Sequence, residues 1–99
     1  MQNLATSQSK NGYSYRLIHR TEREAVFQQL DGDRVAGFEV GRIKTARAGE
    51  VFGKFYPERE VFWIDEDFGA VAWYAMSIEK AMQILEEIQN GTRITPKNK

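Results

Sequence analysis

Cysteine is absent from this 99-residue chain, and histidine occurs once, at position 19. Without cysteine the chain can form neither a disulfide nor a thiolate metal site. A single histidine excludes metal centres built from several imidazoles. His19 would need a carboxylate such as Glu24 nearby to act as a general base, and we interpret it instead as the polar end of an edge strand. We therefore expect no metal and no cofactor.

Long apolar runs are absent as well. None approaches the roughly 20 residues that span a bilayer, and the polar start MQNLATSQSKNG does not have the pattern of a secretory signal. We expect a cytoplasmic protein that does not contact a membrane. Hydrophobic residues still make up 41% of the chain and aromatic residues 12%, which is enough for one packed core without disulfides.

Charge is balanced over the whole chain but not along it. Residues 1–59 hold ten Lys and Arg against seven Asp and Glu, residues 60–87 hold one Lys against seven acids, and residues 88–99 hold three basic residues and no acid. Proteins that bind nucleic acid in bulk usually have a basic excess, so the net charge of zero argues against that class. The uneven distribution can still attract a charged partner locally.

Catalytic and phosphate-binding motifs are missing too. No GxxxxGK[ST] or GxGxxG stretch occurs, and no Ser–His–acid set can be assembled. The triplet Asp65–Asp67 lacks the ligand spacing of a calcium loop, so we interpret it as an exposed turn in which Asp65 or Asp67 caps backbone donors. Glu58 and Glu60 have the spacing of a carboxylate pair on a strand, but we interpret them as part of a charged, exposed strand or loop. We expect no catalytic residues.

Patterning in the first half of the chain predicts an antiparallel meander. Tyr13, Tyr15 and Leu17 recur with a period of two, as in a half-buried strand. Asp31-Gly32 is the strongest turn signal, because glycine adopts the positive φ of tight hairpins. The expected strands cover residues 13–18, 24–30, 34–45, 52–56, 59–65 and 70–76.

The third of these strands contains a break in its periodicity. Phe38 and Val40 share one face, whereas Ile43 is out of phase with them. A bulge at Gly41 would bring all three side chains inward, and we expect one there.

Glu39 is a charged residue between two apolar neighbours of this strand. Strand geometry points it away from them. We expect it either to face water or to pair across the sheet with an arginine such as Arg16 or Arg23.

A helix is predicted over residues 78–90. Ser77 is a good N-cap, Glu79 complements the helix dipole in the first turn, and Gly91 fits the left-handed position that ends a helix. One apolar stripe should face the sheet. It comprises Ile78, Ala81, Met82, Leu85 and Ile88.

These elements predict an α+β fold, an antiparallel sheet of four or five strands with one C-terminal helix packed on one face. Residues 70–76 fit strand or helix, but their aromatic and β-branched side chains favour a strand. We expect a flexible N-terminal segment over residues 1–11, a single domain over residues 12–91 and a polar tail over residues 92–99.

Three segments carry a resemblance to known proteins: an aromatic–Glu–Val strand, a Gly…Tyr–Pro–x–x–Glu segment and an aromatic–Gly–x–x–Ala–Trp segment before the helix. Together, over residues 13–89, they resemble a group of short uncharacterised proteins of bacteriophages and mobile elements, especially of the Bacteroidetes. The group has no assigned activity, so the resemblance implies only a small accessory protein that binds rather than catalyses. The matching positions are Phe38, Glu39 and Val40; Gly53, Tyr56, Pro57 and Glu60; and Phe68, Gly69, Ala72 and Trp73.

The stretch from Arg42 to Tyr56 is the best candidate for a working surface, because basic groups alternate there with aromatic rings. Guanidinium and ammonium groups hold phosphate, and exposed rings stack on bases. If residues 46–53 fold back over the preceding strand, the basic groups converge on one face. The alternative is that the aromatics belong to the core and the cations only solubilise the loop. The predicted site comprises Arg42, Lys44, Arg47, Lys54, Phe52 and Tyr56, with Phe55 beside them.

We expect a small non-enzymatic interaction protein that binds and inhibits or recruits a host protein. Inhibition of a host defence system is the sharpest form of this hypothesis, and the location is then the cytoplasm of the bacterial host. The alternative is a binder of a nucleotide or short nucleic acid through the Arg42–Tyr56 surface. For this alternative we expect a homo-oligomer.

Overall fold

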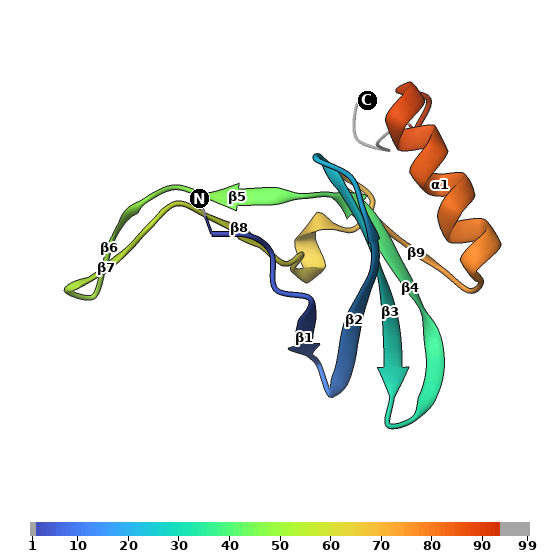
Figure 1. Cartoon of the computed structure of the whole chain (residues 1–99), viewed down its shortest axis with the longest axis horizontal. Helices are drawn as coiled ribbons and strands as arrows, with labels where there is room; N and C mark the ends of the chain where they lie inside the picture. Colours follow the sequence, from blue (N-terminus) through green and yellow to red (C-terminus); the bar gives the residue numbers. More distant parts are fainter. Residues whose placement is uncertain (1, 94–99) are drawn as a thin grey trace.

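A computed structural model describes residues 2–93 of the chain. Five strands form the main antiparallel sheet in the order β1-β2-β3-β4-β9, and the helix α1 packs against one face of it (Figure 1). This arrangement confirms the α+β fold predicted from the sequence. The elements are β1 (Ser7–Lys10), β2 (Tyr13–Arg20), β3 (Glu24–Asp31), β4 (Arg34–Arg42), β9 (Ala72–Ala75) and α1 (Ile78–Asn90).

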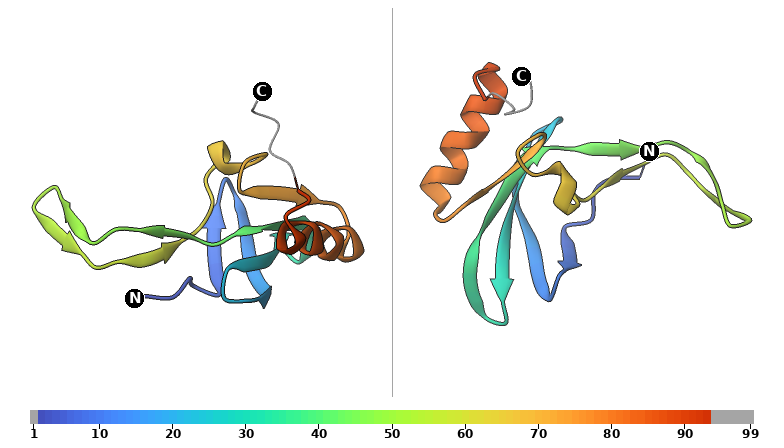
Figure 2. Two further views of the ribbon diagram at one scale, coloured as in Figure 1. Left: turned by 90° about the horizontal axis from the view of Figure 1, so that it is seen from above. Right: turned by 180° about the vertical axis from the view of Figure 1, so that it is seen from behind.

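Two further strand pairs form an arm that leaves the sheet at the end of β4. β5 (Lys44–Ala46) pairs with β8 (Arg59–Val61), and beyond them β6 (Gly49–Val51) pairs with β7 (Lys54–Tyr56). Figures 1 and 2 show this arm reaching away from both the sheet and the helix. A short 3₁₀ helix, η1 (Asp65–Asp67), follows the arm and leads the chain back towards β9.

The face of the sheet under α1 holds one of two apolar cores. Ser77 caps the helix by accepting the backbone N–H of Lys80 at 3.1 Å, and Gly91, with φ of 74°, ends it. Both helix boundaries predicted from the sequence are thereby confirmed. This helix-side core consists of Val26, Phe38, Val40, Trp73, Ala75, Ala81, Ile84, Leu85 and Ile88.

The stripe by which α1 packs differs from the predicted one. Ile84 is 1% exposed, whereas Ile78 and Met82 are 37% and 38% exposed. The helix has a wide apolar arc that includes all three side chains. The position of the helix axis over the sheet decides which part of that arc is buried, and it selects the part centred on Ala81, Ile84, Leu85 and Ile88.

The opposite face, which we call the open side, holds the second core. Trp63, just after β8, is 1% exposed, and its Nε1–H donates to the carbonyl of Arg42 at 2.8 Å. Phe62 packs edge-on against Tyr15 and Phe27, with ring centroids 5.0 and 4.8 Å apart. The chain returning from the arm is therefore docked on the sheet by aromatic residues. This open-side core consists of Leu4, Tyr15, Ala25, Phe27, Trp63 and Ala72.

The predicted bulge at Gly41 is not present. β4 ends at Arg42, and Ile43 packs against the open-side core, on the other face from Phe38 and Val40. Gly41 serves a different purpose, because a Cβ there would lie 2.4 Å from the carbonyl oxygen of Val71. The glycine thus lets the chain entering β9 approach β4 closely, with Ala72 directly opposite Gly41.

The structure differs from the flexible N-terminal segment predicted over residues 1–11. Ser7–Lys10 is strand β1, Leu4 is 5% exposed in the open-side core, and Gln2 forms a bridge with Arg59. The backbone N–H of Leu4 donates to Glu60 Oε1 at 2.7 Å. Residues 2–11 are ordered because one leucine and one strand ladder tie them to the sheet.

The polar tail predicted over residues 92–99 is described only at its start, and residues 94–99 lie outside the described part of the chain. Arg93 packs its guanidinium 5.1 Å from the ring centroid of Trp73 and lies 2.7 Å from Glu87 Oε1.

Candidate functional site

The tip of the arm is a two-residue hairpin turn. Phe52 and Gly53 join β6 to β7 with φ angles of 52° and 76°. A hairpin turn in which both central residues have positive φ is type I′, and it strongly prefers Asn-Gly. A bulky residue in the left-handed region costs on the order of 1–3 kcal/mol. Phe52 therefore occupies, under strain, a position that asparagine would occupy at lower cost.

Apolar side chains at this tip have no core to enter. Phe52 is 103% exposed, Phe55 67% and Val51 50%. Figure 1 shows the tip well away from α1 and from the main sheet. The possibility that the aromatic residues of this stretch are core residues does not hold for Phe52 and Phe55. Grouped exposed apolar residues of this kind mark interaction sites.

The six residues predicted to form one site are divided between the arm and its base. Residues 46–53 extend away from the sheet (Figure 2), which differs from the predicted fold-back. The reason is that β6 and β7 pair with each other, so the backbone hydrogen bonds of the segment are satisfied in a straight ribbon. Arg47, Phe52, Lys54 and Tyr56 lie on the arm, and Arg42 and Lys44 lie at its base.

Lys44 fastens the base of the arm to η1. Its Nζ lies 2.7 Å from Asp67 Oδ2, and the same oxygen accepts the backbone N–H of Ile64 at 2.8 Å. Burial acts to raise the pKa of Asp67, but the bonds from Lys44 and Ile64 outweigh it, so the pKa lies below its ordinary value. Asp67 thus caps the turn, as predicted from the sequence, and Lys44 is held in an ion pair with Asp67.

Glu60 fastens the other strand of the base. Arg20 donates to its two carboxylate oxygens at 2.8 and 3.3 Å. These bonds, followed by the one from the Leu4 amide, lower the pKa of Glu60. Glu58 is exposed, so the two glutamates with carboxylate-pair spacing have different surroundings.

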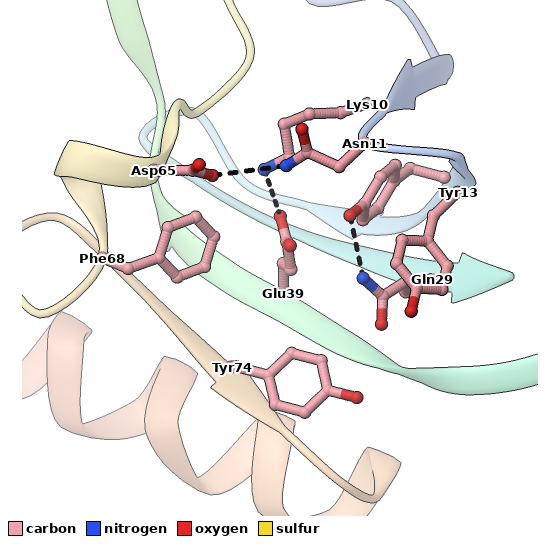
Figure 3. Close-up of a pocket in the computed structure, with 9 residues that line it drawn as sticks. Lys10, Asn11, Tyr13, Gln29, Glu39, Asp65, Phe68 and Tyr74 are labelled. Carbon is pink, nitrogen blue, oxygen red and sulfur yellow. Dashed lines mark hydrogen bonds and ion pairs between the residues drawn. The ribbon is translucent and has the colours of Figure 1, made fainter. Parts of the chain in front are cut away.

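A second candidate site is a hollow of about 270 Å³ on the open side of the sheet, between the β1–β2 turn and η1 (Figure 3). Tyr74 is fixed beside it, because its hydroxyl donates to the carbonyl of Ala36 at 2.7 Å. Gly37 makes room for this ring, since a Cβ there would come within 1.9 Å of the hydroxyl oxygen. The hollow is lined by Lys10, Asn11, Tyr13, Tyr15, Gln29, Glu39, Asp65, Phe68 and Tyr74.

Lys10 and Glu39 form a shielded ion pair in this hollow. The Nζ of Lys10 lies 3.3 Å from Glu39 Oε1 and donates to the carbonyl of Trp63 at 3.3 Å. Burial raises the pKa of Glu39 even though the ammonium of Lys10 opposes the shift. The predicted choices for Glu39, water or an arginine such as Arg16 or Arg23, are replaced by Lys10, because β1 adds to the sheet and carries that lysine over the open side.

None of the residues that line the hollow belongs to the site predicted from the sequence. Lys10 and Asn11 fall in the segment expected to be flexible. One sequence signal does point to them, because Asn11-Gly12 is the preferred type I′ dipeptide and is flanked by the β-prone run Tyr13–Tyr15. Read as a hairpin, this signal predicts a strand before it, and that strand carries Lys10.

Residues 2–93 contain no group of three or more His, Asp and Glu placed to hold a metal ion. No helix in this range is long and apolar enough to cross a membrane. No protein-family model, curated protein or solved structure matches the chain. Function is therefore inferred from the arm and the hollow themselves.

Proposed function

We propose that this chain is a non-enzymatic interaction protein whose arm inserts Phe52 into an apolar pocket of a protein partner. The observation that supports this most is Phe52 itself, which is fully exposed and occupies a strained turn position. An aromatic ring on a hairpin presents a large apolar area with few rotatable bonds. Such rings supply most of the binding energy at many protein interfaces.

The surroundings of Phe52 have the composition of an interface centre with a polar rim. Val51 and Phe55 extend the apolar area. Arg47 and Lys54 lie close to it in the chain and are exposed, as is the acidic Glu50. Apolar residues at the centre with mixed charges at the edge are typical of protein–protein interfaces.

The resemblance to short phage and mobile-element proteins supports a host protein as the partner and the bacterial cytoplasm as the location. In its sharpest form the proposal is that the chain inhibits a host defence protein by occupying a pocket with Phe52. An inhibitor of this kind needs an anchor and a rigid support and no catalytic residues.

A nucleotide or short nucleic acid is the second candidate ligand of the arm. It is favoured by one observation, the alternation of Arg47 and Lys54 with the exposed rings of Phe52 and Phe55. Cations beside exposed rings can hold phosphates while bases stack.

Replacing Phe52 by a photo-reactive benzoylphenylalanine and irradiating the protein in host lysate would identify what the tip touches. The partner is then purified, and its affinity is measured for the wild type, for Phe52→Asn and for Met76→Asn. Met76 is 76% exposed and lies before α1, so it is a matched control for the loss of an exposed apolar side chain. We expect Phe52→Asn to weaken binding by about tenfold or more, and Met76→Asn to leave it unchanged.

Two results would contradict the protein partner. If Phe52→Asn binds as tightly as the wild type, the tip is not the anchor. If the cross-linked species is nucleic acid, if binding falls steeply with salt, and if Arg47→Glu with Lys54→Glu abolishes it, the second candidate replaces the first. A cross-link between two copies of this chain would instead show a homo-oligomer.

A further inference from the structure

Negative charge exceeds positive charge around the hollow on the open side. Glu39 and Asp65 line the hollow, and Glu66 lines a smaller one that adjoins it. Lys10 is the one cation among the residues that line these two hollows. Three carboxylates, of which Glu39 is buried and Asp65 and Glu66 are exposed, therefore line these two hollows with a single ammonium group.

The chain already holds one cation here through its own side chains. The Nζ of Lys10 lies between 4.8 and 5.3 Å from the centroids of three aromatic rings, and a carboxylate and a backbone carbonyl complete its surroundings. Aromatic faces beside a carboxylate are the chemistry by which proteins recognise organic cations. The rings are those of Tyr15, Phe62 and Phe68.

The remaining space lies beside Lys10, between Phe68 and Tyr74 and above Glu39 (Figure 3). Asp65 stands at its edge, and its Oδ1 accepts only a long bond of 3.4 Å from the side chain of Asn11. Flat walls and carboxylate acceptors suit a guanidinium group better than a second ammonium. Guanidinium is planar, stacks on aromatic rings and has five N–H donors in a fixed fork.

We infer that the hollow binds a guanidinium group, either of an arginine side chain on a partner or of a small guanidinium compound. The group lies against the rings of Phe68 and Tyr74 and donates to the carboxylates of Glu39 and Asp65. The electrostatics of Glu39 agree, because burial and then the nearby charge of Asp65 raise its pKa. A second cation in the hollow would offset both effects. The site is separate from the arm, so it does not depend on the proposed role of Phe52.

The test is a titration of isotope-labelled full-length protein with N-acetyl-arginine amide, followed by amide chemical shifts. The matched probe is N-acetyl-citrulline amide, which has the same shape and no charge. We expect saturable shifts around the hollow with a dissociation constant on the order of 1–10 mM for the arginine probe. The citrulline probe should cause no saturable shift at the same concentrations.

Two variants and a control locate the site. Asp65→Asn should weaken arginine binding about twofold to fivefold, and Phe68→Leu about threefold to tenfold. Asp33→Asn removes an exposed acid in the β3–β4 turn and should change nothing. Phe52→Asn should also leave arginine binding intact, so this inference and the proposed function of the arm can fail independently.

A capped Gly-Gly-Arg-Gly-Gly peptide separates the two sources of the group. Binding at least about tenfold tighter than the amide indicates an arginine within a protein partner, and equal binding indicates a small compound. The inference is overturned if the citrulline probe binds as well as the arginine probe. It is also overturned if the arginine probe gives no saturable shift, or if both variants bind it like the wild type.

Discussion

Phe27 in the sheet and Phe52 on the arm are the same residue type in opposite surroundings. Phe27 is fully buried and packs edge-on against Phe62 and Trp63. Phe52 is fully exposed, and residues 44–61, which make up the arm, include no buried residue. Burial of apolar surface therefore holds the sheet together, whereas the arm depends on strand pairing, a tight turn and the contacts at its base.

This difference indicates what each region is for. Two-stranded hairpins are marginal by themselves in water, and the arm is supported by Lys44–Asp67 on one strand and Arg20–Glu60 on the other. An arm that contributes no core but presents aromatic rings is suited to contact with another molecule. The comparison predicts that changes in the main sheet and the helix alter stability and that changes at the tip of the arm alter binding.

Removing residues 1–10 should have the largest effect on stability. The truncation deletes β1, exposes the site that Leu4 fills and leaves the buried carboxylate of Glu39 without Lys10. Loss of a buried leucine costs about 2–4 kcal/mol, and a buried charge left unpaired costs about 3–5 kcal/mol. Thermal unfolding should show a midpoint lower by about 15 °C or more. A midpoint within a few degrees of the wild type would mean that this segment is not docked; Asn3→Ala, at an exposed position, is the control.

The face of α1 that packs on the sheet can be tested by two alanine substitutions. Ile84→Ala should reduce the free energy of unfolding by about 2–4 kcal/mol, because it leaves a cavity in the helix-side core. Met82→Ala, two residues away and on the more exposed part of the arc, should cost less than about 1 kcal/mol. Urea denaturation of both variants gives the comparison. A larger loss for Met82→Ala than for Ile84→Ala would favour the stripe predicted from the sequence, and equal losses would contradict the observed packing.

Two glutamates should give opposite dependences of stability on pH. The pKa of Glu39 is raised above 4.5 by burial, so its contribution to stability is present below 4.5 and is lost as pH rises through its folded pKa. The pKa of Glu60 is lowered below 4.5 by Arg20, so its contribution is present above 4.5 and is lost as pH falls. Glu39→Gln should therefore gain stability relative to the wild type as pH rises, and Glu60→Gln should lose it.

Urea denaturation at pH values from about 3 to 7 measures both differences. Parallel curves for the two variants would show that the surroundings of Glu39 and Glu60 are alike, which would contradict the contrast between the hollow and the base of the arm.

Shortening the arm should have the smallest effect on stability. Ala46 and Arg59 are paired, so replacing residues 47–58 by Asn-Gly closes the ribbon with a favoured turn. The free energy of unfolding should change by less than about 1 kcal/mol, since no buried residue is removed. A loss above about 2 kcal/mol on shortening would show that the arm is part of the folding unit.

In the full arm, Phe52→Asn should raise the free energy of unfolding by up to about 1 kcal/mol by relieving the strained turn.

The secondary structure of the main sheet and the helix could be predicted because the sequence signals for it are local. Ser77 and Gly91 bound the helix through their own hydrogen bonds and φ angle. Gly32, with φ of 63°, lies in the two-residue turn that follows Asp31 and joins β3 to β4. The sequence also places Phe52 within the predicted site, since an aromatic residue beside a glycine and basic residues is visible in it. The exposure of Phe52 cannot be predicted from the sequence, because nothing local distinguishes a ring at a projecting tip from one in a core.

The amino-acid sequence by itself determined the class of fold, the limits of the helix and the presence of aromatic residues on a polar stretch. Only the tertiary structure decided that Lys10 pairs with Glu39, 29 positions away, and that Ile84 rather than Met82 faces the sheet. It also decided that the arm projects. The physical reason is range: periodicity, caps and turns act over a few residues, whereas these three outcomes depend on which strands become neighbours and where the helix settles on them.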